Sequence, residues 1–146
     1  MASAAKFFNN DQKIAIEEAI GKAELNTSGE IRVHIENNCK GDVLQTAVAV
    51  FKKLKMHETE LRNAVLFYLA IKDRKFAIYG DKGIHELVPE NFWNDVKEKM
   101  SEQFQSGRFT EGLCAGIEMA GLHLKSNFPH QINDKNELSN DISFGG

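Results

Sequence analysis

The chain has 146 residues, of which 42% are hydrophobic and 27% charged, and its formal net charge is −3 at pH 7. These values describe one globular domain that is large enough to bury a core. The net negative charge provides no basic field, so the composition excludes a nucleic-acid-binding protein.

The first part of the chain predicts a helix, a strand and a second helix. Residues 11–25 and 42–54 carry apolar side chains at helical spacing. Between them, Ile31, Val33 and Ile35 alternate with polar residues over positions 30–36. Strict alternation is typical of a half-exposed strand, and we expect this one at a sheet edge.

The second part predicts two strands joined by a tight turn, followed by two helices. Residues 63–71 are apolar throughout, as in a central strand covered on both faces. The further predicted elements are a turn at 72–75, a strand at 76–79, and helices at 89–105, beginning with Pro89, and 110–126. Gly112 and Gly116 indicate a close approach of the last helix to the sheet. We expect one domain over residues 1–128 and a polar, disordered tail over 129–146.

The order of these elements predicts an α/β fold. The first two strands are joined through a helix and should be parallel, whereas the tight turn makes the third antiparallel. We therefore expect a three-layer α/β/α sandwich with a central mixed sheet and about four helices.

The same topology predicts which polar residues meet. The starts of the first two strands share a sheet edge with the end of the third, so Glu30, Asn63 and Asp81 should converge there. The loop before the last helix should add Glu111, while Asp73 should lie at the opposite edge. Carboxylate and amide oxygens suit calcium best, although other divalent cations remain open. The alternative is a set of solvated loop carboxylates.

Two other functions are compatible with these residues. In a metal-assisted phosphatase, Arg62 or Arg108 would pair with phosphate oxygens and Asp81 would act as nucleophile or base. In a non-catalytic interaction module, the half-exposed strand and the polar tail would contact a protein partner.

The cysteines, the N-terminus and the apolar runs of the sequence predict the cellular environment. The two cysteines, Cys39 and Cys114, form no disulfide framework, which predicts reduced thiols. The N-terminus lacks a secretory pattern, and the longest apolar run is far shorter than the ~20 residues of a membrane span. We expect a cytoplasmic monomer that does not insert into a membrane.

Five short motifs, in this order and spacing, make residues 21–125 resemble the TPM-domain family. They are TSGEIRV at 27–33, NAVL at 63–66, KDRK at 72–75, IYGD at 78–81 and GRFTEG at 107–112. The resemblance implies an α/β/α sandwich with a mixed sheet, a fold with which calcium has been associated. Some plant members are described as acid phosphatases of the chloroplast lumen, and other members act in photosystem repair or beside membrane receptors. Many bacterial members carry a signal peptide, a transmembrane helix and a glycine-rich tail, and we expect this chain to differ from them in these features.

Overall fold

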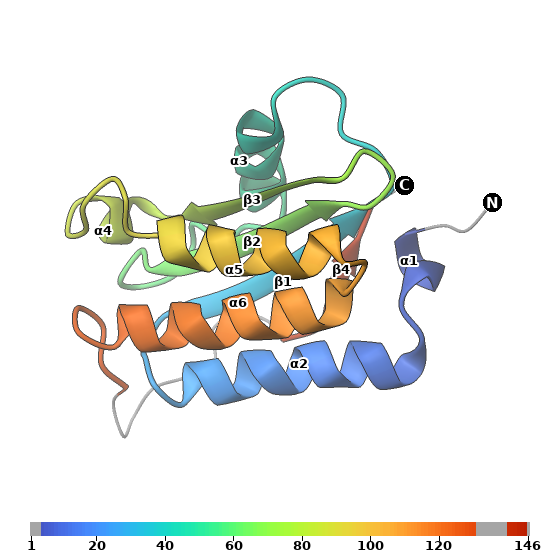
Figure 1. The fold of residues 1–146 in the computed structure, drawn as a ribbon. Coiled ribbons are helices and arrows are strands. Elements are labelled where there is room, and N and C mark those ends of the chain that lie inside the picture. The colour runs from blue at the N-terminus through green and yellow to red at the C-terminus, as the bar shows by residue number, and fades with distance from the viewer. Residues whose placement is uncertain (1–3, 131–139, 146) are drawn as a thin grey trace.

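A four-stranded mixed sheet forms the middle layer of the protein (Figure 1). The computed structural model describes residues 4–130 and 140–145. The strands are β1 (Glu30–Glu36), β2 (Ala64–Ala70), β3 (Lys75–Gly80) and β4 (Ser143–Phe144), and they lie in the order β3-β2-β1-β4. β1 is parallel to β2, and β3 is antiparallel to β2, as the sequence predicts.

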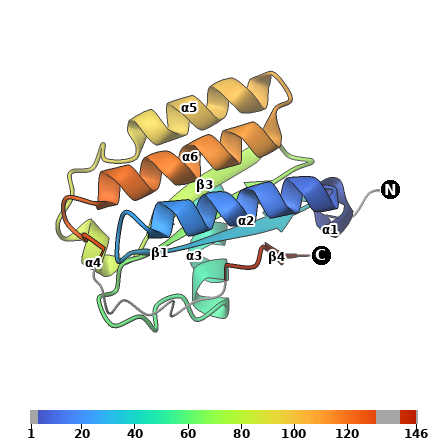
Figure 2. The same ribbon diagram turned by 90° about the horizontal axis from the view of Figure 1, so that it is seen from below.

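Helices cover both faces of this sheet, which confirms the predicted three-layer sandwich (Figures 1 and 2). On one face lie α2 (Asn10–Glu24), α5 (Asn94–Gln105) and α6 (Phe109–Leu124), and on the other lies α3 (Val43–Lys53). The short helices α1 (Ala4–Phe7) and α4 (Lys82–His85) complete the described elements. In the described part of the chain, no helix is both long and apolar enough to cross a membrane.

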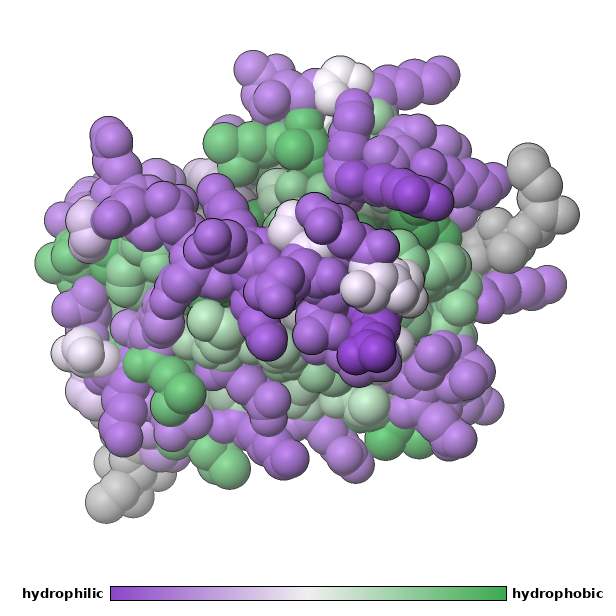
Figure 3. All heavy atoms as spheres, viewed as in Figure 1, coloured by the Kyte–Doolittle hydropathy of each residue, from purple (hydrophilic) through white to green (hydrophobic). Residues whose placement is uncertain are grey.

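Alternation along the strands divides the core into two parts. Ile31, Val33 and Ile35 of β1 face the three-helix side, whereas Leu66 and Tyr68 of β2 face α3. Every residue of β2 is buried, because β1 and β3 flank it and helices cover both its faces. In the view of Figure 1, hydrophilic side chains make up most of the visible surface, with smaller hydrophobic areas between them (Figure 3).

Glycines in α6 allow close packing, as the sequence indicates. A Cβ at Gly116 would lie 2.5 Å from the Met100 sulfur of α5 and 3.4 Å from the Phe67 ring of β2. Gly121 allows a similarly close approach to α2, because a Cβ added at this position would lie 2.8 Å from the Cα of Ala23. Because these two positions carry no side chain, α6 can pack closely against both α5 and α2.

Two predictions about the polar segments are wrong. β1 is an inner strand, because β4 pairs with it in parallel at His34 and Ile35. Its polar side is not half-exposed, since the exposed fractions of Glu30 and His34 are 3% and 6%. The predicted disordered tail is ordered at residues 129–130 and 140–145, where Pro129 bridges to Thr27 and β4 joins the sheet. Residues 131–139 of that tail lie outside the described residues.

The start of the third long helix also differs from its prediction. Pro89 begins a turn in which its carbonyl accepts a hydrogen bond from the Phe92 amide, and α5 starts only at Asn94. Pro89 therefore fixes the connection between α4 and α5.

Candidate functional site

Three segments meet at the sheet edge where the sequence predicts a site, and we call residues 28–30, 62–64 and 80–81 the acidic edge. Glu30 is the register partner of Ala64, and the Asp81 amide donates to the Ala64 carbonyl over 2.9 Å. The buried Asn63 side chain donates from Nδ2 to Ser28 Oγ over 3.3 Å. The predicted convergence of these segments is therefore found.

Two carboxyl groups, those of the half-buried Glu24 and the buried Glu30, lie together at this edge. The Glu24 carboxylate, from the last residue of α2, accepts a hydrogen bond from the Ile31 amide over 3.0 Å. The same group is hydrogen-bonded to the Glu30 side chain and to that of Asn140. Burial, and then the charge and hydrogen bond of Glu30, raise the pKa of Glu24 to about 8. The charged form of Glu24 is therefore disfavoured beside Glu30.

Asp81, the second predicted ligand, is committed to different partners. Its carboxylate accepts two hydrogen bonds from Arg62, over 2.7 Å from Nε and 2.9 Å from Nη2. It also accepts from the Lys82 amide and so caps α4. The same bidentate bond raises the pKa of Arg62. These three bonds fill most of the acceptor positions of the Asp81 carboxylate.

α6 begins at the far end of the sheet, at the hairpin between β2 and β3. Phe109 stacks on Phe104 with ring centroids 5.3 Å apart, and Phe104 contacts Phe76 at the start of β3, 5.1 Å away. Glu111 and Arg108 are exposed in this part of the molecule. The structure therefore does not bring Arg108 together with Arg62 and Asp81.

The last turn of α6, in contrast, reaches the acidic edge, where Leu124 packs on Gly29. At 1.5 Å per residue, about 20 Å of helix separates Leu124 from Glu111. Glu111 therefore does not join the predicted ligands. Asp73 lies at the end opposite Glu30, as expected, because its carboxylate accepts from the amide of Cys39, which follows β1.

Of the residues predicted as ligands, Glu30, Asn63 and Asp81 lie at this edge and Glu111 does not, and Glu24 joins them there. Within residues 4–130 and 140–145, no three His, Cys, Asp or Glu side chains group in a way that could hold a metal ion. A cation at the acidic edge would thus have two carboxylates and would need amide, carbonyl and water oxygens for its remaining ligands.

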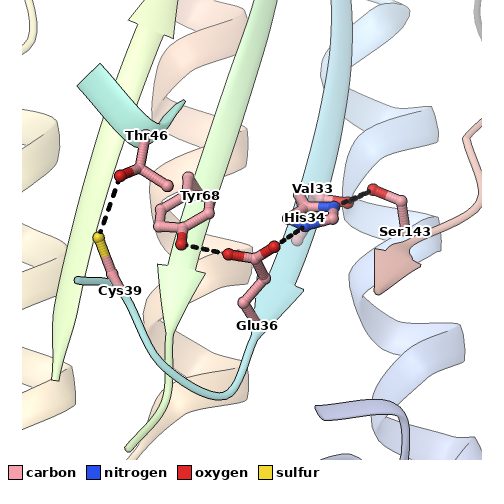
Figure 4. A network of polar contacts seen from close by, with 7 residues as sticks. All are labelled: Val33, His34, Glu36, Cys39, Thr46, Tyr68 and Ser143. Atoms are coloured by element: carbon pink, nitrogen blue, oxygen red, sulfur yellow. Dashed lines mark hydrogen bonds and ion pairs between the residues drawn. The ribbon is translucent and has the colours of Figure 1, made fainter. Parts of the chain in front are cut away.

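A second polar network crosses the α3 side of β1 and β2 (Figure 4). The Tyr68 hydroxyl donates to Glu36 over 2.5 Å, and Glu36 Oε1 lies 3.2 Å from His34 Nε2. His34 Nδ1 lies 2.7 Å from Ser143 Oγ in β4. Burial lowers the pKa of His34 and raises that of Tyr68, so both are neutral at pH 7.

This network contains a serine, a histidine and a carboxylate, but its contacts indicate a structural role. Ser143 Oγ also lies 3.3 Å from the Val33 carbonyl, inside the paired edge of β1. In Ser-His-acid hydrolases the serine is exposed at a substrate site beside donors for the developing oxyanion. Here the hydroxyl joins two strands, and the network fixes the position of β4.

Sequence reasoning missed Glu24 and the network partners for different reasons. The sequence pattern places Glu24 on a helix and contains no local signal that brings it to the strand edge. The short connection from Leu25 to Gly29 was the available signal, because it turns α2 back beside the start of β1. No local pattern identified Ser143, which reaches His34 from far along the chain.

Comparisons with known proteins agree with this fold. The family model for the TPM domain matches residues 1–122. The NMR structure of the BA42 protein from the psychrophilic bacterium Bizionia argentinensis is 46% identical, with a TM-score of 0.92 over 99% of this chain and 100% of that one. The N-terminal domain of cg2496 from Corynebacterium glutamicum shares the fold, with 12% identity and a TM-score of 0.63 over 96% of this chain and 81% of that one. No curated protein sequence matches significantly. The chain belongs to the TPM-domain family.

Proposed function

We propose that this TPM-domain protein binds a divalent cation, preferably calcium, at the Glu24–Glu30 carboxyl pair of the acidic edge. The observation that carries the proposal is the direct contact of the Glu24 and Glu30 carboxyl groups, and the raised pKa of Glu24 supports it. A half-buried carboxyl group whose pKa is raised to about 8 beside a second carboxyl is a position where positive charge is favourable. A divalent cation would replace the proton and neutralise both groups.

The available ligands favour calcium. Carboxylates and neutral oxygens are hard ligands, and calcium accepts six to eight of them in flexible arrangements. Asn63 and Asn140 are the nearby amide side chains at this edge, and waters would complete the shell. With only two carboxylates, we expect weak binding, with a Kd of about 0.1 to 1 mM, in the range of calcium sites with few charged ligands.

Binding should be linked to proton release. A ligand carboxyl must lose its proton before it coordinates a metal, so affinity should rise with pH up to the pKa of the pair. Below pH 8 we expect the apparent affinity to increase by up to about tenfold per pH unit.

A calcium titration of the metal-free protein, followed by amide chemical shifts, tests the proposal. We expect saturable shifts in residues 24–31 and 62–64, and their loss in Glu30→Gln. Glu111→Gln is the matched control, because it removes an exposed carboxylate at the opposite end and should leave binding unchanged. Shifts confined to residues 107–112, or the same affinity in Glu30→Gln and the unmodified chain, would contradict the proposal.

A further inference from the structure

A groove runs between the outer strand β3 and helix α5, on the three-helix side of the sheet. Two cavities form it, with volumes of about 460 and 190 Å³. Both are lined by Phe76 of β3 and Ser101 of α5, so they adjoin each other. α5, which lies on this face of the sheet (Figure 1), supplies the facing wall from Asn94 to Gln105. The smaller cavity lies at the hairpin between β2 and β3, opposite to the acidic edge.

The outer edge of β3 offers backbone groups to a further strand. β3 is the last strand on its side of the sheet formed by the described residues. The Asp81 amide donates to the Ala64 carbonyl, and hydrogen-bonded and non-bonded pairs alternate along antiparallel strands. This alternation directs the N–H and C=O groups of Phe76 and Ile78 away from β2. Within residues 4–130 and 140–145, no strand pairs with them.

The smaller cavity is shaped for one apolar side chain. The rings of Phe76, Phe104 and Phe109 line it, together with the buried Leu69 of β2. Phe104 holds the other two rings in place, with ring centroids 5.1 Å from Phe76 and 5.3 Å from Phe109. An apolar cavity of about 150 Å³ binds benzene, so this cavity suits an aromatic or leucine-sized side chain.

The charges of the groove favour a negatively charged ligand. Arg74 is exposed and lines the smaller cavity, while Lys97 and Glu98 line the larger one. Two positive groups and one negative group give the groove a positive charge, whereas the whole chain carries −3. The neighbouring Lys75 is engaged elsewhere, because its Nζ donates to two backbone carbonyls before α3. An arginine and an apolar cavity therefore stand side by side.

We propose that this groove binds the C-terminal end of an extended peptide from a partner protein, with an apolar last residue. A C-terminal residue carries a carboxylate and a side chain on the same Cα, which matches Arg74 beside the smaller cavity. The preceding residues pair with the outward backbone groups of Phe76 and Ile78. The chain's own strand β4 lies at the other side of the sheet, beside β1, so the peptide comes from another molecule.

The position of the carboxylate also defines the direction of the peptide. Arg74 precedes β3, so a peptide that ends at Arg74 runs antiparallel to β3. The backbone bonds supply affinity, and the two cavities supply specificity for the last side chain and for a residue before it.

Fluorescence anisotropy on the unmodified, full-length chain tests the groove. The probe is the hexapeptide Gly-Ser-Thr-Val-Thr-Phe, with fluorescein at its N-terminus and a free C-terminal carboxylate. We expect saturable binding that weakens about tenfold when the C-terminus is amidated, because a charge-assisted bond is lost. Replacing the terminal phenylalanine by alanine should weaken binding by about the same factor, since the smaller cavity would stay unfilled.

Variants of the chain locate the contacts. Arg74→Gln should weaken the free-carboxylate peptide about tenfold and leave the affinity of the amidated peptide unchanged. Lys40→Gln is the matched control, because Lys40 is exposed in the loop before α3 and lies outside the groove. Ser101→Trp fills the position that the two cavities share and should abolish binding, whereas Glu102→Trp, at the next, exposed position, should not. Circular dichroism shows whether each variant is folded.

The proposal is overturned if the hexapeptide does not bind at about 1 mM, or if the amidated peptide binds as tightly as the free carboxylate. An equal loss of both peptides in folded Arg74→Gln, or unchanged binding in folded Ser101→Trp, would also overturn it. If 3-phenylpropanoate competed as strongly as the unlabelled hexapeptide, the groove would be a site for small aromatic carboxylic acids, and the peptide proposal would be wrong.

Discussion

Replacing Glu24 by glutamine should stabilise the metal-free protein, and more so at high pH. The folded-state pKa of Glu24 is raised from 4.5 to about 8, so between these values the folded chain retains a proton that the unfolded chain has lost. The contribution of this group to stability therefore decreases as pH rises from about 4.5 to 8. Glutamine keeps an acceptor for the Ile31 amide but has no proton to lose.

The size of the effect follows from the pKa shift. One pKa unit corresponds to about 1.4 kcal/mol, so the full shift corresponds to an upper limit of about 4 to 5 kcal/mol at pH 8.5. Because the Glu24 side chain is partly exposed, solvent screens the repulsion, and we expect about 2 kcal/mol. For a domain of this size, that difference raises Tm by about 5 °C.

Urea unfolding at pH 5 and pH 8.5 in the presence of EDTA measures this difference. Glu24→Gln should be close to the unmodified chain at pH 5 and about 2 kcal/mol more stable at pH 8.5. Glu18→Gln, which changes an exposed carboxylate of the same helix, is the control and should have little effect at either pH. If Glu24→Gln changed the stability equally at both pH values, the raised pKa of Glu24 beside Glu30 would be refuted.

Three further changes test other parts of the structure. Gly121→Ala places a Cβ against the backbone of α2 and should lower the free energy of unfolding by about 1 to 3 kcal/mol, measured by thermal unfolding. Gly21→Ala, whose Cβ would enter open space, should instead raise it by about 0.5 to 1 kcal/mol. Tyr68→Phe removes the hydroxyl that donates to Glu36 and should destabilise the chain by about 1.5 to 3 kcal/mol in urea; an unchanged midpoint would show that the bond contributes nothing. Asp81→Asn removes the carboxylate on which the phosphatase hypothesis depends, so phosphomonoester hydrolysis that survives this change belongs to a contaminant.

The layers and strand directions could be predicted because they follow from local signals. Unbroken apolar character predicts the buried strand β2, and strict alternation places β1 within one residue of its observed bounds. The connection lengths then determine which strand ends meet, so Glu30, Asn63 and Asp81 were correctly placed at one edge.

The errors arise where contacts are made over long distances in the sequence. The direction of α6 relative to the sheet depends on packing between helices, which no single segment encodes. The sequence therefore predicts Glu111 at the acidic edge, whereas it lies at the opposite end of the sheet. β4 has only two residues, too few for a period, and its polar surroundings resemble a disordered tail. The bond from Arg62 to Asp81 depends on side-chain geometry that follows only from the folded loop.

The central claim is a divalent cation bound at the Glu24–Glu30 pair. The most direct measurement is a calcium titration of the Ile31 amide by NMR at pH 6.5 and pH 8.5, because this amide donates to Glu24. We predict a saturable shift at both pH values, with an affinity at least tenfold higher at pH 8.5, where Glu24 loses its proton. No shift at Ile31, or an affinity independent of pH, would contradict the claim.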